Sequence, residues 1–292
     1  MMTLVNSYRF WSAPLWLEQG KRGRLPLLLL HGFMGCSEDF DLVVQEMIAL
    51  KWDGDRTMSL PSIYALDLPG HGKTDLRDRH QLKAYGMAET ARGVWEWTQQ
   101  VQPGPWAIAG YSMGGRLALY LAAHFPQTFP VTVAIGASPG LNKEGDRRQR
   151  QWLDNQRALT LEHSQTLELF EEFLHAWYKM PLFSSLASHP NFATMLARRR
   201  RNDPQRLALS LRHLGLGQQP FLLPALSTYP GQLQLVVGAQ DRKFVALNQA
   251  IARRCPRAQL ILVPHCGHTV PLENPTALAQ ILVQAIPQTD EP

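Results

Sequence analysis

The sequence predicts a mixed α/β fold, in which helices flank a mostly parallel central sheet and a helical cap is inserted between two of the strands. Short apolar runs ending in Gly, Asp or His alternate with longer mixed segments, a pattern typical of strands and helices in turn. The runs lack polar alternation, as expected for strands buried on both faces. With 292 residues, 45% of them hydrophobic, the chain is long enough for one large domain with an insertion.

Six of the apolar runs are predicted as parallel strands. The stretch Tyr8–Leu17 is a candidate for an additional antiparallel strand at the sheet edge. The six runs are, in chain order, Pro26–Leu30, Ser62–Leu66, Trp106–Ala109, Val131–Ile135, Gln234–Val237 and Leu260–Val263.

The long segment between the fourth and fifth of these runs is predicted as the cap. It holds no strand-like run but has helical patterning and several aromatic residues, among them Phe170, Phe173 and Trp177. We expect the cap to span residues 140–217. The α/β core is then formed by residues 1–139 and 218–292.

Composition excludes several protein classes. The three cysteines form no C-x-x-C pair and are too few for a disulfide framework. Neither a secretory signal nor an apolar run of about 18 residues is present. We therefore expect a soluble cytoplasmic protein without membrane insertion.

The formal net charge of +5 is compatible with nucleic acid, an anionic membrane surface or a multiply charged anionic substrate as partner. Arginines concentrate at 147–150 and 198–201, both within the predicted cap. Two solvated helix faces are one interpretation, because four consecutive helical residues point in nearly every direction. Interleaved aromatics and nucleic-acid motifs are lacking, so nucleic-acid binding is not expected.

The strongest local motif is Gly110-Tyr111-Ser112-Met113-Gly114, between a predicted strand and a helix-like run. This strand–turn–helix context is that of a nucleophile elbow, in which a strained serine is exposed at the helix N-terminus. Small residues are needed at 110 and 114 because strand and helix pack closely there. The dipole and free N–H groups of the helix start favour negative charge near Ser112.

A serine hydroxyl needs a base and an orienting acid, and the chain provides candidates after its last two predicted strands. Asp241 follows the fifth strand, and His268 follows the sixth. His265 is a rival base, but Gly267 allows a tight loop before His268. A metal site at His265, Cys266 and His268 is less favoured, because no fourth ligand of suitable spacing is apparent.

Two backbone N–H groups near Ser112 could form an oxyanion hole. Met113 follows the serine directly and provides the first. The loop His31-Gly32-Phe33-Met34-Gly35 after the first parallel strand provides the second, for which Phe33 is the candidate. The segment Asp67-Leu68-Pro69-Gly70-His71-Gly72 fits either a plain Pro-Gly turn or a direct role.

These motifs, in this order, resemble the α/β-hydrolase superfamily over nearly the whole chain. Narrower features are similar to the 2-succinyl-6-hydroxy-2,4-cyclohexadiene-1-carboxylate synthase family of menaquinone and phylloquinone biosynthesis. They are Gly110–Arg116, Ser138-Pro139-Gly140-Leu141 with the arginines from 147, Trp177-Tyr178, Gly215-Leu216-Gly217-Gln218-Gln219-Pro220 and Asp241-Arg242-Lys243-Phe244. The chain departs from the family in having Leu216 where threonine is common.

The resemblance implies a lyase that needs no metal or organic cofactor. Its small substrate carries three carboxylates, loses a ring proton to Ser112 activated by His268, and expels pyruvate. The residues that the resemblance assigns to substrate binding are Tyr111, Arg116, Arg147, Trp177, Lys243 and, among residues 198–201, Arg200.

Alternatives remain open at this stage. The same triad could serve a serine esterase, thioesterase or carbon–carbon hydrolase, because only the cap distinguishes these reactions. A non-catalytic binding protein is disfavoured by the intact triad. Arg116 could form an ion pair with a neighbouring carboxylate, and Trp177 could be part of the core of the cap. The sequence does not indicate an oligomeric state.

Overall fold

The computed structural model describes residues 8–11, 23–50, 60–74 and 82–287. Within these residues, seven strands form one sheet in the order β1-β3-β2-β4-β5-β6-β7. All neighbouring strands are parallel except β1, which is antiparallel to β3. The strands are β1 (Tyr8–Trp11), β2 (Leu27–Leu30), β3 (Ile63–Leu66), β4 (Ala107–Tyr111), β5 (Val131–Ile135), β6 (Gln232–Gly238) and β7 (Ala258–Val263).

The predicted fold class is therefore confirmed, and each of the six expected parallel strands is present. β4 is longer than expected, since it continues to Tyr111 and delivers the chain to Ser112. The edge strand is described at Tyr8–Trp11, whereas residues 12–17 of that prediction lie outside the described residues.

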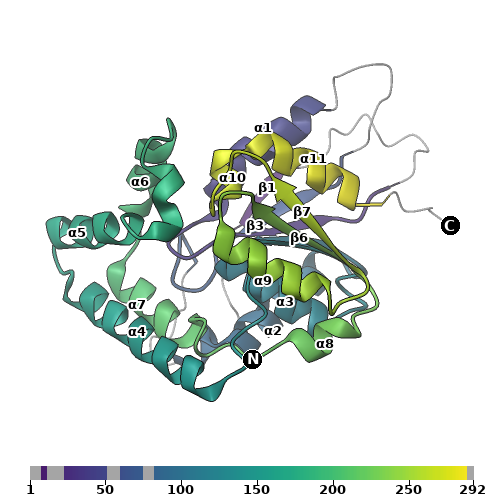
Figure 1. Ribbon diagram of the computed structural model, residues 1–292. Coiled ribbons are helices and arrows are strands. Elements are labelled where there is room, and N and C mark those ends of the chain that lie inside the picture. Colours follow the sequence, from purple (N-terminus) through teal and green to yellow (C-terminus); the bar gives the residue numbers. More distant parts are fainter. Residues whose placement is uncertain (1–7, 12–22, 51–59, 75–81, 288–292) are drawn as a thin grey trace.

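Helices cover both faces of the sheet (Figure 1). On one face, α1 (Asp41–Leu50), α10 (Val270–Glu273) and α11 (Pro275–Ala285) pack in an apolar cluster with β2 and β5. The clusters on the other face include residues of α2 (Met87–Val101), α3 (Met113–His124), α8 (Leu223–Ser227) and α9 (Arg242–Ala252). All four residues of β2 are fully buried, as expected for a strand in the middle of the sheet.

The chain between β5 and β6 forms the helical insertion (Figure 1). Four of its helices lie within the expected interval 140–217: α4 (Glu144–His163), α5 (Leu167–Tyr178), α6 (Phe192–Arg199) and α7 (Pro204–Leu214). α8, also between β5 and β6, follows that interval and packs on the sheet. Short 3-10 segments complete the fold: η2 (Ser37–Phe40), η3 (Leu82–Tyr85) and η4 (Pro181–Leu186). An apolar cluster that joins Met34 and Phe33 of the core to α4, α5, α6 and α7 seats the cap over the sheet.

None of the helices in the described part of the chain is both long and apolar enough to cross a membrane.

The central position of β2 leads to a stability prediction. Leu28→Ala removes a fully buried side chain from the sheet, and we expect a loss of about 2–5 kcal/mol in the free energy of unfolding. Leu167, whose side chain in α5 is largely exposed, is the matched control, and Leu167→Ala should change that free energy by less than about 0.5 kcal/mol. Urea denaturation measures both, and equal effects would contradict the assignment of β2 to the core.

Candidate active site

Ser112 occupies the turn between β4 and α3. It is the N-cap of α3, with φ of 51° and ψ of −104°, a positive φ that is rare for a residue with a side chain. The turn is tight because α3 packs directly on the sheet. A Cβ at Gly110 would lie 2.2 Å from the carbonyl oxygen of Gly114, and a Cβ at Gly114 would lie 2.2 Å from that of Leu30. Glycine is therefore required at both positions of the predicted elbow.

Ser112, His268 and Asp241 form one hydrogen-bonded chain. The distance from His268 Nε2 to Ser112 Oγ is 3.2 Å, and that from His268 Nδ1 to Asp241 Oδ2 is 2.7 Å. The carboxylate can only accept at Nδ1, so Nδ1 carries the proton and Nε2 presents its lone pair to the serine hydroxyl. The structure thus brings together the three residues selected from the sequence, whereas the rival His265 is exposed.

The loop that carries His268 is fixed by a residue that the sequence analysis missed. Glu273 accepts N–H bonds from Gly267 at 2.7 Å and Thr269 at 2.8 Å, one on each side of the histidine. The Thr269 hydroxyl in turn lies 3.1 Å from the Tyr111 hydroxyl. These bonds hold the imidazole between the serine and Asp241.

A buried histidine orders the predicted oxyanion loop. The Leu68 N–H donates to His31 Nε2 at 2.9 Å, so the proton of this ring is on Nδ1, which lies 2.7 Å from the Gly32 carbonyl. Burial lowers the pKa of His31 and keeps the ring neutral. Phe33 and Met113, the two predicted N–H donors, both line the cavity that Ser112 faces.

The segment after β3 supports the same loop. Asp67 accepts N–H bonds from Ser37 at 2.7 Å and from Lys73 at 2.9 Å, and its own carbonyl accepts the Thr74 hydroxyl. Its side chain is buried, and the segment does not line the cavity. Asp67 therefore has a supporting role in the turn rather than a place at the site.

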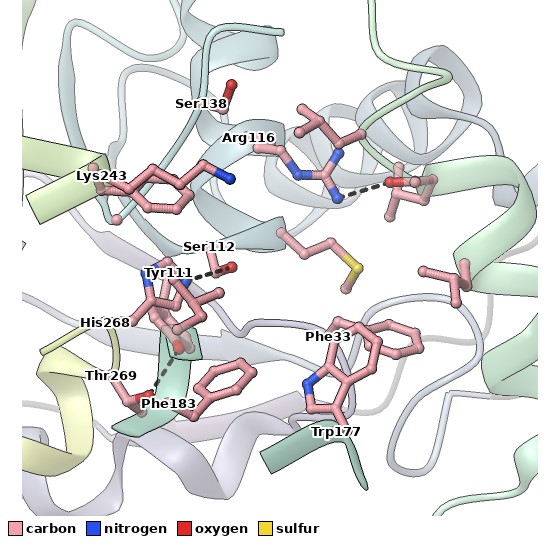
Figure 2. Close-up of a pocket in the computed structure, with 18 of the residues that line it drawn as sticks. Phe33, Tyr111, Ser112, Arg116, Ser138, Trp177, Phe183, Lys243, His268 and Thr269 are labelled. Carbon is pink, nitrogen blue, oxygen red and sulfur yellow. Dashed lines mark hydrogen bonds between the residues drawn. The ribbon is translucent and has the colours of Figure 1, made fainter. Parts of the chain in front are cut away.

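A cavity of about 570 Å³ lies between the sheet and the cap, with Ser112 and His268 in its wall. Figure 2 shows Arg116, Ser138 and Lys243 on one side of Ser112, and the aromatic rings of Phe33, Phe183 and Trp177 on the other. Tyr111 also lines it. Arg116 and Lys243 thus give one end of the cavity its cationic character, whereas aromatic rings predominate at the other end, where Tyr178 carries Arg199 on its hydroxyl.

Two of the arginines that were predicted to bind the substrate, Arg147 and Arg200, do not line this cavity. Arg147 forms an exposed ion pair with Glu144, one turn back on α4, and it is Arg150 that lines the cavity. Arg150 is drawn inward by Asp154, which is buried and accepts its Nε at 2.8 Å. The arginine of α4 that lines the cavity thus lies three positions, almost one helical turn, beyond Arg147, whose role in substrate binding stays a prediction.

Arg200, the candidate of the second arginine cluster, does not line the cavity. Its side chain is 42% exposed and pairs with Glu171 on α5 at 2.9 Å. Arg199 lines the cavity instead, and its two terminal nitrogens bind the two oxygens of Asp39 at 2.8 and 2.7 Å. Its Nε donates to the Tyr178 hydroxyl at 3.1 Å. A bidentate bond to the core fixes Arg199 rather than its neighbour.

Arg116 differs from these arginines because, within the described residues, it forms no ion pair with a carboxylate. Nη1 donates to Gln219 Oε1 at 3.2 Å, and Nη2 donates to the Leu214 carbonyl at 2.8 Å. Burial, together with repulsion from Arg150, lowers the pKa of Arg116 to about 9, which leaves it charged at neutral pH. The alternative of an ion pair with a neighbouring carboxylate is not observed. Its hydrogen bonds within the described residues are to neutral acceptors, and the carboxylate of Asp154, which pairs with Arg150, also attracts its charge.

The charges that line the cavity have one sign. Among the described lining residues, four side chains are cationic and none is a carboxylate; the four are Arg116, Arg150, Arg199 and Lys243. Asp39 and Asp154 compensate Arg199 and Arg150 from behind. Arg116 and Lys243 form no ion pair within the described part of the chain, although Asp154 also attracts the charge of Arg116 from beyond ion-pair distance. The cavity is therefore suited to a ligand with several negative charges.

Comparison with known proteins agrees with this geometry. A model of the alpha/beta hydrolase family matches residues 27–281. A putative 2-succinyl-6-hydroxy-2,4-cyclohexadiene-1-carboxylate synthase of Bacillus subtilis is 29% identical over 268 residues, covering 91% of each protein. The synthase of that name from an Enterobacter species is 30% identical over 267 residues, covering 91% of this chain and 93% of the relative.

A solved structure of MenH from S. aureus has the same architecture. It superposes with a TM-score of 0.82 and 26% sequence identity, and the match covers 97% of both chains.

The tight elbow leads to a second prediction. Gly110→Ala places a methyl group against the backbone of Gly114, and we expect a loss of about 1–3 kcal/mol in the free energy of unfolding. Gly145 in α4 is the matched control, because a Cβ there would meet nothing within 4 Å. Gly145→Ala should raise that free energy by about 0.4–1 kcal/mol. Thermal melts of both variants measure the difference, and a harmless Gly110→Ala would contradict the packing described for the elbow.

Proposed function

The chain belongs to the alpha/beta hydrolase family and, within it, to the 2-succinyl-6-hydroxy-2,4-cyclohexadiene-1-carboxylate synthase family, and we propose that it is a lyase of menaquinone or phylloquinone biosynthesis. The proposed reaction eliminates pyruvate from 2-succinyl-5-enolpyruvyl-6-hydroxy-3-cyclohexene-1-carboxylate. The product is 2-succinyl-6-hydroxy-2,4-cyclohexadiene-1-carboxylate.

One observation carries this proposal. The serine of an intact hydrogen-bonded triad faces a cavity with four cationic side chains and, among the described residues, no carboxylate. An uncharged ester would form no ion pair with these cationic side chains. The proposed substrate has three carboxylates, on the ring, the succinyl chain and the enolpyruvyl group, and each needs a cationic partner in a partly desolvated cavity.

We assign the carboxylates to the cationic end of the cavity. Arg116 and Lys243 are the uncompensated cations, and Arg150 extends the same side from the cap. Tyr111 and Trp177 line the cavity close to the triad and provide surface for the ring. In this proposal Arg150 and Arg199 take the places that the sequence analysis gave to Arg147 and Arg200.

The numbering of the double bonds in substrate and product defines the chemistry. The proton at ring carbon 2 is lost, the double bond between carbons 3 and 4 shifts, and the bond from carbon 5 to the enolpyruvyl oxygen breaks. His268 accepts the Ser112 proton, and the Ser112 oxygen accepts the ring proton. The enol that leaves becomes pyruvate by gaining a proton on carbon, so no water is consumed.

Backbone donors at the oxyanion loop support this elimination. Carbon 2 carries the succinyl ketone, so removing its proton places negative charge on the ketone oxygen. The N–H groups of Phe33 and Met113 are suited to accept that charge, as they are in acyl transfer. The triad then acts as a general base, and Ser112 forms no covalent bond to the substrate.

A serine esterase, thioesterase or carbon–carbon hydrolase would use the same three residues with Ser112 as nucleophile. The cationic lining favours the lyase. A coupled assay for pyruvate, run with the enolpyruvyl substrate, distinguishes the two: the lyase releases pyruvate, and the hydrolase does not.

The serine provides the first test within the site. Ser112→Ala should lower the rate of pyruvate release by at least about 10³-fold while substrate affinity stays nearly unchanged, because the hydroxyl acts in the transition state. His268→Ala should behave likewise. His265→Asn, at the exposed neighbouring histidine, is the control and should retain the wild-type rate. A near-wild-type rate for Ser112→Ala would refute the role of the serine.

The arginines of α4 provide the second test. Arg150→Ala should raise KM about tenfold or more, because a cation facing a partly desolvated carboxylate is lost. Arg147→Ala, at the exposed arginine paired with Glu144, should change KM less than about twofold, as expected of a surface ion pair. Steady-state kinetics of the two folded variants measure this contrast. The reverse order would restore Arg147 to the site.

A further inference from the structure

Gln219 links Arg116 to the sheet at the point where the cap rejoins the core. Its side chain is 1% exposed. The amide oxygen accepts Arg116 Nη1 at 3.2 Å, and the amide nitrogen donates to the Ser138 carbonyl at 3.1 Å. The next residues are tied to the same loop, since the Leu222 N–H donates to the Pro139 carbonyl at 2.7 Å. Gln219 thus holds the guanidinium in one place on the cavity wall.

We propose that Gln219 is a specificity-determining positioning residue: it fixes Arg116 with a neutral acceptor and so reserves the charge of Arg116 for a carboxylate of the ligand. The inference rests on the proposed function, because it deepens the assignment of Arg116 to substrate binding. Gln219 contacts Arg116 and acts on the ligand only through Arg116.

The chemistry of the two acceptors supports this role. Gln219 and the Leu214 carbonyl take one N–H from each terminal nitrogen of Arg116, whereas a guanidinium has five N–H donors. Both acceptors are uncharged, so they orient the guanidinium of Arg116 without neutralising its charge. The hydrogen bonds of the described residues leave three N–H donors of Arg116 without an acceptor, and Arg116 lines the cavity.

Arg199 shows the opposite arrangement in the same cavity. It is fixed by the carboxylate of Asp39 in a bidentate ion pair, and its charge is compensated before any ligand arrives. A glutamate at position 219 would do the same to Arg116, because it has the size of glutamine and an anionic oxygen at the same place. The amide at position 219 therefore leaves the cavity with one more cation that is not paired with a carboxylate than a glutamate would.

Two substitutions at position 219 separate this role from a purely structural one. Gln219→Glu keeps the size and the acceptor for Arg116 but adds a charge and loses the N–H donor to the Ser138 carbonyl, whereas Gln219→Met keeps neutrality and removes both hydrogen bonds. We expect Gln219→Glu to weaken ligand binding by at least about tenfold and Gln219→Met to weaken it only a few-fold. A packing or hydrogen-bonding role alone predicts that Gln219→Met, which loses both hydrogen bonds, binds no better than Gln219→Glu, which loses one. The matched control is Gln218→Glu, the same change at the exposed neighbour, which should bind as wild type.

The readout is the dissociation constant of benzene-1,3,5-tricarboxylate, measured by calorimetry over a range of salt concentrations beside KM for pyruvate release. Gln219→Glu should also flatten the salt dependence of binding, because one cation fewer faces the ligand. If Gln219→Glu does not fold, the salt dependence of Gln219→Met decides: a slope like that of wild type supports the inference, and a flattened one overturns it.

The outcomes separate this inference from the lyase proposal. If the wild-type protein releases no pyruvate but Gln219→Glu weakens tricarboxylate binding, the lyase proposal fails and the role of Gln219 stands. If pyruvate is released and Gln219→Glu binds and turns over like wild type, only the role of Gln219 fails. It fails equally if the tricarboxylate does not bind to the wild-type protein, or if Gln219→Met is the weaker binder.

Discussion

The close approach of α3 to the sheet at Gly110 and Gly114 is the constraint on which the rest of the site depends. No side chain fits at either position, since a Cβ would meet backbone at 2.2 Å. The packing forces Ser112 into a positive φ and presents its hydroxyl at the start of α3. Everything else in the site is placed relative to that hydroxyl. The His268 loop reaches it from beyond β7, and the Phe33 loop lies beside it from the end of β2.

Above this rigid base, the cap and core divide the cationic side chains into two kinds. Arg150 and Arg199 each have a buried or nearly buried carboxylate partner, so their positions are stable without ligand. Arg116 is hydrogen-bonded by neutral groups and, within the described residues, forms no ion pair of its own. A buried charge without a counter-ion is costly, and a protein retains one where a ligand provides the opposite charge. In the proposed lyase a tricarboxylate substrate completes this arrangement, and the triad acts as the base of an elimination.

The sequence predicted those features that are specified locally. Buried parallel strands, the elbow and the residues after the strand ends leave signals within a few positions, so the sheet, Ser112, Asp241 and His268 could be placed from the sequence. The cap arginines could not, because their direction depends on distant partners. Arg199 is turned inward by Asp39, 160 positions away, while Arg147 is turned outward by Glu144. Arg150 is the exception, because its partner Asp154 lies four positions further along the same helix. That pair could have been predicted from the sequence. Glu273 and Gln219 were missed for the same reason, since their partners are backbone groups and an arginine brought near by folding.

The central claim is that Ser112 removes a proton and makes no covalent bond while the enolpyruvyl group is expelled. The most direct measurement follows pyruvate and the intact mass of the protein together in samples quenched during turnover of the enolpyruvyl substrate. For the proposed elimination, we expect pyruvate to accumulate while the protein mass stays that of the unmodified chain. An adduct on Ser112, or a substrate consumed without release of pyruvate, would contradict it.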